Sequence, residues 1–483
     1  MRLPLPLPAQ LGAVLLGLAR NPALPPALLR RLLGHRATRD EAVMWRTDLT
    51  EELAEEIVAL GDTVLVHTLA CNRNIPPGVK HRLANSPDTS VRAAIAFREE
   101  LPREVWERLI ADPSVEVRES AAENEDVPVD LRARLARDPA PTVRAKLAQR
   151  WTGAPEEIRR IWLTDAESTV RAAACATYFR RLPHPVPPAD LHPALLADPV
   201  TRAGVVAHLD LGPDTARELA TDQDPEVRAA VAAHPDLPAE LRETLAGDPD
   251  PLVRAEVFAR QDTPEGRRAS IYAELRAGAE RAGAGLIASE EEDFASYVAY
   301  QGLGHRHLPW VSAAPLDHVD SPYVCFRRSL AMSGPLPAEA VARLLDDEDG
   351  TVRAAVARRT PDLDPVTAER IERRHTASRK HPWSPTDHVV FPPETLRRFA
   401  TDPDPRIRAL ALRDPDLPAG LAEGLAADGS DRVRRGVAAH PSLPTPALLT
   451  LLADQDEWVA RTAAGSPVLP RDVMEEILAF AAL

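Results

Sequence analysis

The side chains with the most chemical potential in this sequence gather between residues 266 and 320. His305 and His307 stand one residue apart, and Asp317 and His318 follow closely. Histidine nitrogens and carboxylate oxygens are zinc ligands, but a zinc site needs several converging donors and a second shell that orients them. Two histidines in an HxH pattern, with no neighbouring cysteine and no HExxH, do not supply that set. We therefore expect no metal here.

The same segment is rich in aromatic residues, although the whole chain is only 4% aromatic. Rigid scaffolds often carry their function on such insertions, and large aromatic side chains are common binding hot spots. The predicted binding residues are Phe294, Tyr297, Tyr300, His305, His307 and Trp310. The alternative is that the segment is a structural cap that plugs a kink between two halves of the chain.

A second irregular stretch, residues 370–393, is basic in an otherwise acidic chain. A local positive patch can steer an anionic partner despite an opposite net charge. The residues that could contribute are Arg373, Arg374, Arg379, Lys380 and Trp383. The alternative is a solvated loop without a ligand.

Catalytic motifs are missing from the sequence. It contains no nucleophile elbow, phosphate-binding glycine loop, kinase signature or metalloprotease helix. Paired carboxylates such as Glu55 and Glu56 lie in charge runs, whereas a catalytic acid needs burial and a partner. We therefore predict a protein that is not an enzyme and needs no cofactor.

These irregular stretches interrupt a phrase of about 26 residues that recurs along the chain. Residues 222–246 read DQDPEVRAAVAAHPDLPAELRETLA, and residues 402–426 read DPDPRIRALALRDPDLPAGLAEGLA. A fixed period of this size is typical of solenoids, in which each unit contacts mainly its neighbours. The arginine of the phrase falls at Arg92, Arg118, Arg144, Arg171, Arg202, Arg228 and Arg254, and returns at Arg353, Arg408 and Arg434. Cys325 and Ala460 stand where the same arginine is expected.

Each phrase predicts two short helices. Asp224 before Pro225 is an N-cap followed by proline at the first helical position, and His234-Pro235 ends the helix. A second helix follows Leu237-Pro238. Because neither helix is long enough to persist alone in water, stacking must stabilise both. We interpret the Asp and Arg of each unit as an N-cap aspartate with an (i, i+4) arginine, a structural couple that satisfies helix ends and links stacked units. The couples are Asp224 and Arg228, Asp250 and Arg254, and Asp404 and Arg408.

Composition limits the setting of this chain. Of its 483 residues 44% are hydrophobic, and the net charge is −15, which argues against nucleic acid as the partner. Three isolated cysteines fit a reducing cytoplasm. The apolar stretch at 11–19 runs directly into a repeat-like sequence, so we predict an N-terminal repeat and not a cleaved signal. No apolar run is long enough to span a membrane.

The shared form DPDPxVRxAVAxHPxLPxxLxxxLA resembles the leucine-rich repeat variant family, which is often grouped with HEAT-like repeats, over about four fifths of the chain. The resemblance implies an all-α fold, a right-handed α-solenoid of helical pairs. Some members hold an iron–sulfur cluster in a cysteine-rich segment, which this chain lacks. The expected organisation is solenoid repeats in 1–265, an insertion in 266–320 and further repeats in 321–483.

The leading functional prediction is a non-catalytic scaffold that presents a concave solenoid surface to another protein. One alternative is a HEAT-like DNA glycosylase or another nucleic-acid-binding repeat protein, with residues 370–393 in its groove. A net charge of −15 opposes that alternative, because phosphate contacts dominate DNA affinity. A further alternative is a sensor that responds to metal or redox state at the His-rich insertion.

Overall fold

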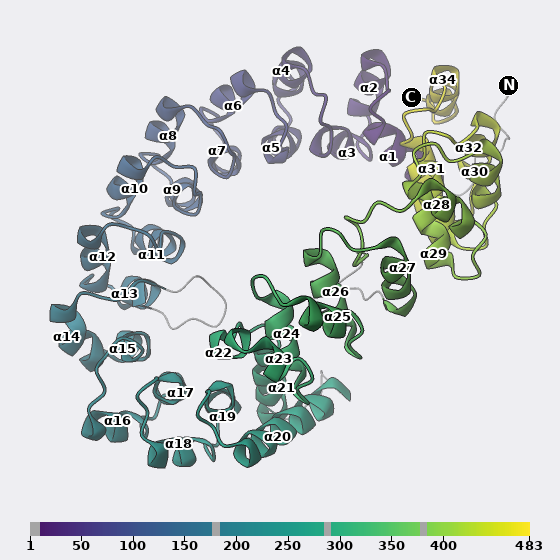
Figure 1. Ribbon diagram of the computed structural model, residues 1–483. Helices are drawn as coiled ribbons and strands as arrows, with labels where there is room; N and C mark the ends of the chain where they lie inside the picture. Colours follow the sequence, from purple (N-terminus) through teal and green to yellow (C-terminus); the bar gives the residue numbers. More distant parts are fainter. Residues whose placement is uncertain (1–9, 176–183, 285–290, 377–383) are drawn as a thin grey trace. The chain divides into compact units, whose positions relative to one another are not determined.

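The computed structural model describes residues 10–175, 184–284, 291–376 and 384–483 (Figure 1). Within these ranges the chain forms 34 α-helices and two short 3-10 helices, and no strand. The predicted all-α repeat fold is therefore confirmed. In the same ranges, no helix combines the length and the apolar character that crossing a membrane requires.

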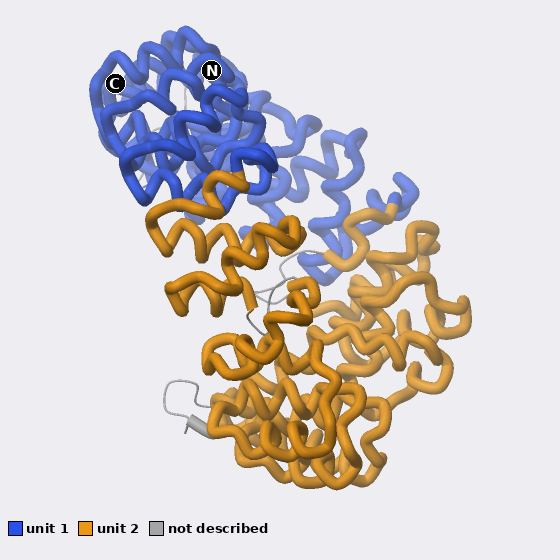
Figure 2. Tube along the Cα trace, turned by 90° about the vertical axis from the view of Figure 1, so that its left-hand side faces the viewer, with its two compact units in different colours: residues 1–131, 390–483 blue, residues 132–389 orange. Residues whose placement is uncertain are grey.

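The chain divides into two compact units (Figure 2). Unit 1 comprises residues 1–131 and 390–483, and unit 2 comprises residues 132–389. This division into compact units does not test where the repeats give way to an insertion, so the expected boundaries around 266–320 stay a prediction.

Unit 1 consists of short helices in pairs. From the N-terminal part they are α1 (Leu11–Arg20), α2 (Pro26–Leu33), α3 (Arg39–Met44), α4 (Glu51–Ala59), α5 (Thr63–Cys71), α6 (Pro77–Leu83), α7 (Thr89–Ala96), α8 (Arg103–Leu109) and α9 (Val115–Ala122). From the C-terminal part they are α28 (Pro393–Phe399), α29 (Pro405–Leu410), η2 (Ala411–Arg413), α30 (Ala419–Ala426), α31 (Asp431–Ala438), α32 (Thr445–Leu451), α33 (Glu457–Ala464) and α34 (Arg471–Phe480). Helix α10 (Val129–Leu135) spans the boundary.

Unit 2 continues the same pairing and contains two longer helices. Its elements are α11 (Pro141–Arg150), α12 (Glu156–Leu163), α13 (Ser168–Cys175), η1 (Ala189–Leu191), α14 (His192–Ala197), α15 (Pro199–Val206), α16 (Pro213–Leu219), α17 (Pro225–Ala233), α18 (Ala239–Leu245), α19 (Pro251–Ala259), α20 (Glu265–Ala284), α21 (Glu291–Leu303), α22 (Pro309–Ala313), α23 (Pro315–His318), α24 (Val324–Met332), α25 (Ala338–Leu345), α26 (Gly350–Arg359) and α27 (Pro365–Arg374).

The pair α17 and α18 shows how one repeat folds. The Asp224 carboxylate accepts a hydrogen bond from the Glu226 N–H at 2.9 Å, so it caps α17 as expected. Val231 is fully buried, and His234 ends the helix. The His234 Nε2 then bonds the Leu209 carbonyl oxygen of the preceding repeat at 3.0 Å, which ties the turn to its neighbour.

The repeat arginine joins successive repeats, and at Arg228 the partner differs from the Asp224 of the expected (i, i+4) couple. Arg228 donates to both oxygens of Asp248, 20 residues later, at 2.8 and 2.9 Å, while Asp224 serves the helix N-terminus. Asp250 and Asp404 also cap their helices. The same 20-residue pairing recurs in Arg92–Asp112, Arg202–Asp222, Arg327–Asp347, Arg408–Asp428 and Arg434–Asp454. The arginine position near residue 325 is therefore occupied by Arg327 and not by Cys325.

In unit 1 the first repeat packs on the last one. Helix α1 lies against α33. The Asn21 amide donates to the carbonyl oxygens of Ala464 and Ser466 at 2.9 and 2.7 Å. Asn124 makes the same two bonds to Ala96 and Arg98, 28 and 26 residues earlier. Residues 11–20 are thus a repeat helix, and α1 occupies the place of a repeat that follows α33.

Candidate binding pocket beside the long helix

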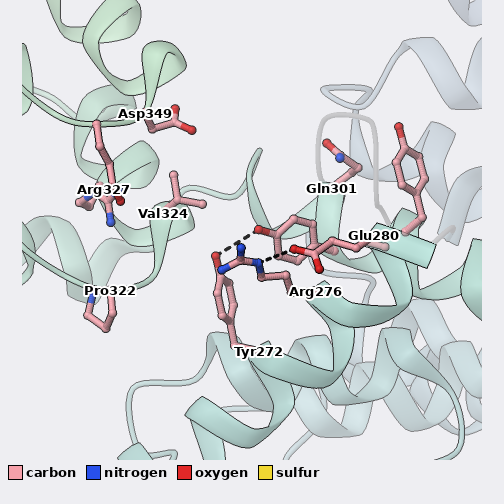
Figure 3. Close-up of a pocket in the computed structure, with 12 residues that line it drawn as sticks. Tyr272, Arg276, Glu280, Gln301, Pro322, Val324, Arg327 and Asp349 are labelled. Atoms are coloured by element: carbon pink, nitrogen blue, oxygen red, sulfur yellow. Dashed lines mark hydrogen bonds and ion pairs between the residues drawn. The ribbon is translucent and has the colours of Figure 1, made fainter. Parts of the chain in front are cut away.

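A pocket of about 540 Å³ lies in unit 2 between two walls. Figure 3 shows these walls facing each other across open space. The first wall comes from the packed helices α20 and α21 and carries Tyr272, Arg276, Glu280, Tyr297, Tyr300 and Gln301. The second wall comes from the segments that begin α24 and α26 and carries Pro322, Val324, Arg327, Glu348 and Asp349.

The pocket forms where the regular pairing of short helices gives way to a longer one. Helix α20 is 20 residues long and packs along α21. Gly278 permits this close approach, since a Cβ atom there would lie 2.5 Å from the Ser296 Cβ. The long helix places Tyr272, Arg276 and Glu280 one turn apart on one face, which is the face that lines the pocket.

The tyrosines of the first wall pack against the core of unit 2. Tyr272 stacks on buried Phe258, with ring centroids 5.5 Å apart, and its hydroxyl lies 3.2 Å from the Tyr300 hydroxyl. Burial, together with this hydrogen bond, raises the pKa of Tyr272. Tyr297 stacks on Phe294 with centroids 6.4 Å apart. Tyr272 is therefore held in place by its contacts with Phe258 and Tyr300.

The guanidinium groups of the pocket are paired with carboxylates. Arg276 bonds Glu280 at 2.8 Å on the exposed face of α20. Arg327 bonds Asp347 at 2.7 Å and Glu348 at 3.1 Å, and it also donates to the Ser321 carbonyl oxygen. These partners occupy the donors of Arg327 on the second wall.

The carboxylates of the second wall differ in their surroundings. Asp349 caps α26 by accepting from the N–H groups of Thr351 and Val352, and it also bonds Arg328. Burial by itself would raise the pKa of Asp349, but the hydrogen bond from the Thr351 hydroxyl and the charge of Arg328 outweigh burial, so the pKa lies below its usual value. Glu348, by contrast, has a side chain that is 88% exposed. It is the most accessible negative group of the lining.

The structure brings together some of the predicted aromatic residues and separates others. Tyr297 and Tyr300 line the pocket, and half-exposed Phe294 lies beside them on α21. Trp310 instead packs edge-on to Phe326 at 5.1 Å, and its indole N–H donates to the Ala259 carbonyl oxygen at 3.0 Å. Trp310 thus packs against the core of unit 2 and does not line the pocket.

The predicted histidines lie outside the pocket lining. His305 and His307 are exposed after α21, and the His307 Nε2 lies 3.3 Å from the Ser312 hydroxyl. Nearby, the His318 ring packs on Trp310, and burial lowers the pKa of His318. Among the residues that the structure describes, no three His, Cys, Asp or Glu side chains group as metal ligands would.

The basic stretch is described only in part. Arg373 and Arg374 are exposed at the end of α27, where Arg373 bonds Glu369 at 2.7 Å and Arg374 bonds Asp346 at 2.5 Å. The other members of the predicted patch, Arg379, Lys380 and Trp383, lie outside the described residues.

Several lining residues escaped the sequence prediction. The spacing of Tyr272, Arg276 and Glu280 is a helical one, so a common face could have been predicted from the sequence. Glu348 and Asp349 look like any other acidic N-cap of a repeat. Their position opposite the tyrosines follows only from the packing of α24 and α26.

Comparison with known proteins supports the repeat assignment. Residues 225–250 and 431–456 match the leucine rich repeat variant family, so the resemblance is confirmed at these two units. The solved structure described as a leucine-rich repeat variant with a novel repetitive protein structural motif is 26% identical; the match covers 46% of this chain and 84% of that one, with a TM-score of 0.33. No curated protein matches the chain.

Two structures of the karyopherin Kap121p also match. The one bound to the extreme C-terminus of the protein phosphatase Cdc14p is 14% identical, with a TM-score of 0.26, and the match covers 95% of this chain and 55% of that one. The one bound to Ste12p is also 14% identical, with a TM-score of 0.21, and 91% and 48% are covered. This chain thus spans about half the length of that karyopherin. TM-scores this low carry no functional information.

Proposed function

We propose that this solenoid of leucine-rich repeat variant units is a non-catalytic scaffold that binds another protein at the tyrosine-lined pocket of unit 2. The observation that carries the proposal is the pocket itself, about 540 Å³ of open space beside Tyr272, Tyr297 and Tyr300. Rigid tyrosines provide large contact area at a small cost in side-chain entropy, which is why they are frequent at protein interfaces.

A role without catalysis is supported by the state of the lining groups. Arg276 and Arg327 are paired with carboxylates, and the raised pKa of Tyr272 leaves it protonated at neutral pH. A nucleophile or general base would need a group poised to change its protonation near the working pH. The lining supplies charged groups of both signs and aromatic surface, which are suited to binding a partner.

A protein partner is better supported than a nucleic acid. The lining carries Glu280, Glu348 and Asp349 against two arginines, and the whole chain has a net charge of −15. Phosphate groups would be repelled by such a surface, whereas DNA binding depends on basic residues. A glycosylase or other nucleic-acid-binding function predicts a salt-sensitive shift of duplex DNA in a gel. Absence of that shift at low salt would remove this alternative.

A cytoplasmic location is part of the proposal. Cys71, Cys175 and Cys325 are free thiols, and the last two are buried. A chain with unpaired thiols in its core fits a reducing compartment.

Site-specific photocrosslinking tests the proposal. A photoreactive amino acid replaces Gln301, an exposed residue of the pocket, and a second variant carries it at Glu240 on α18, outside the pocket. In native lysate we expect one discrete protein adduct from position 301, and we expect excess unlabelled chain to abolish it. Equal adducts from both positions, or none from position 301, would refute the proposal.

A further inference from the structure

We infer that the pocket receives the guanidinium or ammonium group of a basic side chain from the partner protein. This inference rests on the proposed function and adds the chemistry of the bound segment. It follows from the combination of tyrosine rings and an exposed carboxylate in the lining of one pocket.

The tyrosine rings supply the first part of a cation site. Tyr272, Tyr297 and Tyr300 all line the same space, and the Tyr272 and Tyr300 rings are 5.6 Å apart and tilted by 50°. The negative face of an aromatic ring attracts a cation within about 6 Å of its centroid. Since Tyr272 is fixed by Phe258 and by the hydroxyl contact to Tyr300, little ordering is needed when a ligand enters.

The charges of the lining supply the second part. Three carboxylates and two guanidinium groups surround the pocket. Arg327 is engaged by Asp347, Glu348 and the Ser321 carbonyl oxygen, so it offers little to an anionic ligand. Glu348 keeps an 88% exposed carboxylate that can accept hydrogen bonds from an incoming cation.

Arg276, on the first wall with the tyrosines, does not block a cation. Arg276 is paired with Glu280 in an (i, i+4) arrangement, and both side chains are more than half exposed. An exposed pair of this kind is weak and rearranges readily. The net charge of −15 further raises the local concentration of basic segments around the chain.

Isothermal titration calorimetry on the full chain tests the inference with two capped peptides. The first has the sequence Gly-Ser-Arg-Arg-Ser-Gly, and the second replaces both arginines by citrulline, which keeps the shape and removes the charge. We expect the arginine peptide to bind at about 20 mM salt, to weaken at about 300 mM salt, and to bind at least about fivefold tighter than the citrulline peptide.

Four variants locate the binding. The Glu348→Gln change removes the exposed charge and should weaken the arginine peptide about fivefold, as expected for one contact between unit charges in water. Glu240→Gln makes the same change outside the pocket, at a carboxylate that is 71% exposed, and should leave binding unchanged. Tyr300→Leu should weaken binding more than Tyr300→Phe, because phenylalanine keeps the ring that attracts the cation and loses only the hydroxyl contact to Tyr272.

Specific outcomes overturn the inference. Equal binding of the two peptides, equal effects of Glu348→Gln and Glu240→Gln, or no binding of the arginine peptide at low salt would each do so. Failure of the inference remains separate from failure of the proposed function. A crosslinked partner at position 301 whose pocket segment lacks Lys and Arg would leave the scaffold standing and refute the cation site.

Discussion

Gly17 is the residue on which the packing of α1 against α33 depends most directly. A Cβ atom at position 17 would lie 2.0 Å from the carbonyl oxygen of Arg461 and 3.0 Å from the Ala464 Cβ. The nearest obstacle is backbone, which cannot rotate away as a side chain can. In a Gly17→Ala variant, α1 must therefore retreat by about 1.5 Å to regain van der Waals separation.

The expected cost follows from the contacts that this shift weakens. Overpacking of a tight contact costs about 1–3 kcal/mol. The two hydrogen bonds from Asn21 to Ala464 and Ser466 are each worth about 1 kcal/mol and lengthen with the shift. Against this, replacing glycine by alanine inside a helix gains up to about 1 kcal/mol. We expect a net destabilisation of about 2 kcal/mol.

Gly12 provides a matched control in the same helix. It is exposed, and a Cβ atom there would meet nothing within 4 Å. Gly12→Ala should therefore stabilise α1 by up to about 1 kcal/mol through helix propensity alone. The two alanine variants should thus move stability in opposite directions.

Hydrogen exchange followed by mass spectrometry measures the effect where it should occur. In Gly17→Ala we expect faster exchange in α1 and also in α33, because each of these packed helices shields the backbone amides of the other from solvent. Urea unfolding gives the accompanying change in free energy. Unchanged exchange in α33, or equal shifts in both alanine variants, would refute the role of this contact in stabilising unit 1.

Three further predictions concern the repeat ladder and the thiols. Arg408→Ala breaks a largely buried pair with Asp428 and should lower the free energy of unfolding in urea by about 2–3 kcal/mol. Arg103→Ala removes exposed pairs and should lower that free energy by under about 1 kcal/mol. Equal losses would contradict the structural role of the arginine–aspartate pairs between repeats. The Arg408 hydrogen bond holds the pKa of Asp428 below its usual range. The wild-type chain should therefore be more stable to unfolding than Asp428→Asn above about pH 4, and this difference should shrink as acid protonates the folded carboxylate. A stability difference that grows on acidification would refute the pairing. Burial raises the pKa of Cys325 to about 12. We therefore expect a thiol reagent at pH 8 to modify half-buried Cys71 first and to react with buried Cys325 only in denaturant. Reaction of both cysteines at equal rates in the folded chain would contradict this expectation.

Much of the local structure could be predicted from residue types alone. The Asp-Pro start of α17 caps it, and His234 ends it, because these effects act within one helical turn. The pairing of Arg228 could not be predicted with the same rules. Asp224 is nearer in sequence than Asp248, but its carboxylate is engaged by the helix N-terminus, and stacking brings the next repeat into reach.

The candidate site shows the same division. Tyr297 and Tyr300 stood out because aromatic residues are scarce in this chain, and they do line the pocket. Trp310 stood out for the same reason but packs into the core, since composition does not reveal which face of a segment is buried. Glu348 gave no signal at all, because it belongs to an ordinary repeat junction.

The sequence by itself determined a stack of helical pairs, since its caps, prolines and apolar spacings act between residues close together in the chain. Tertiary structure alone decided which distant groups meet. The bonds of Asn21 to Ala464 and Ser466 join residues more than 440 positions apart, and the pocket joins the tyrosines of α20 and α21 to the start of α26. Such contacts depend on how repeat rotations accumulate along the chain, and no short sequence pattern records that sum.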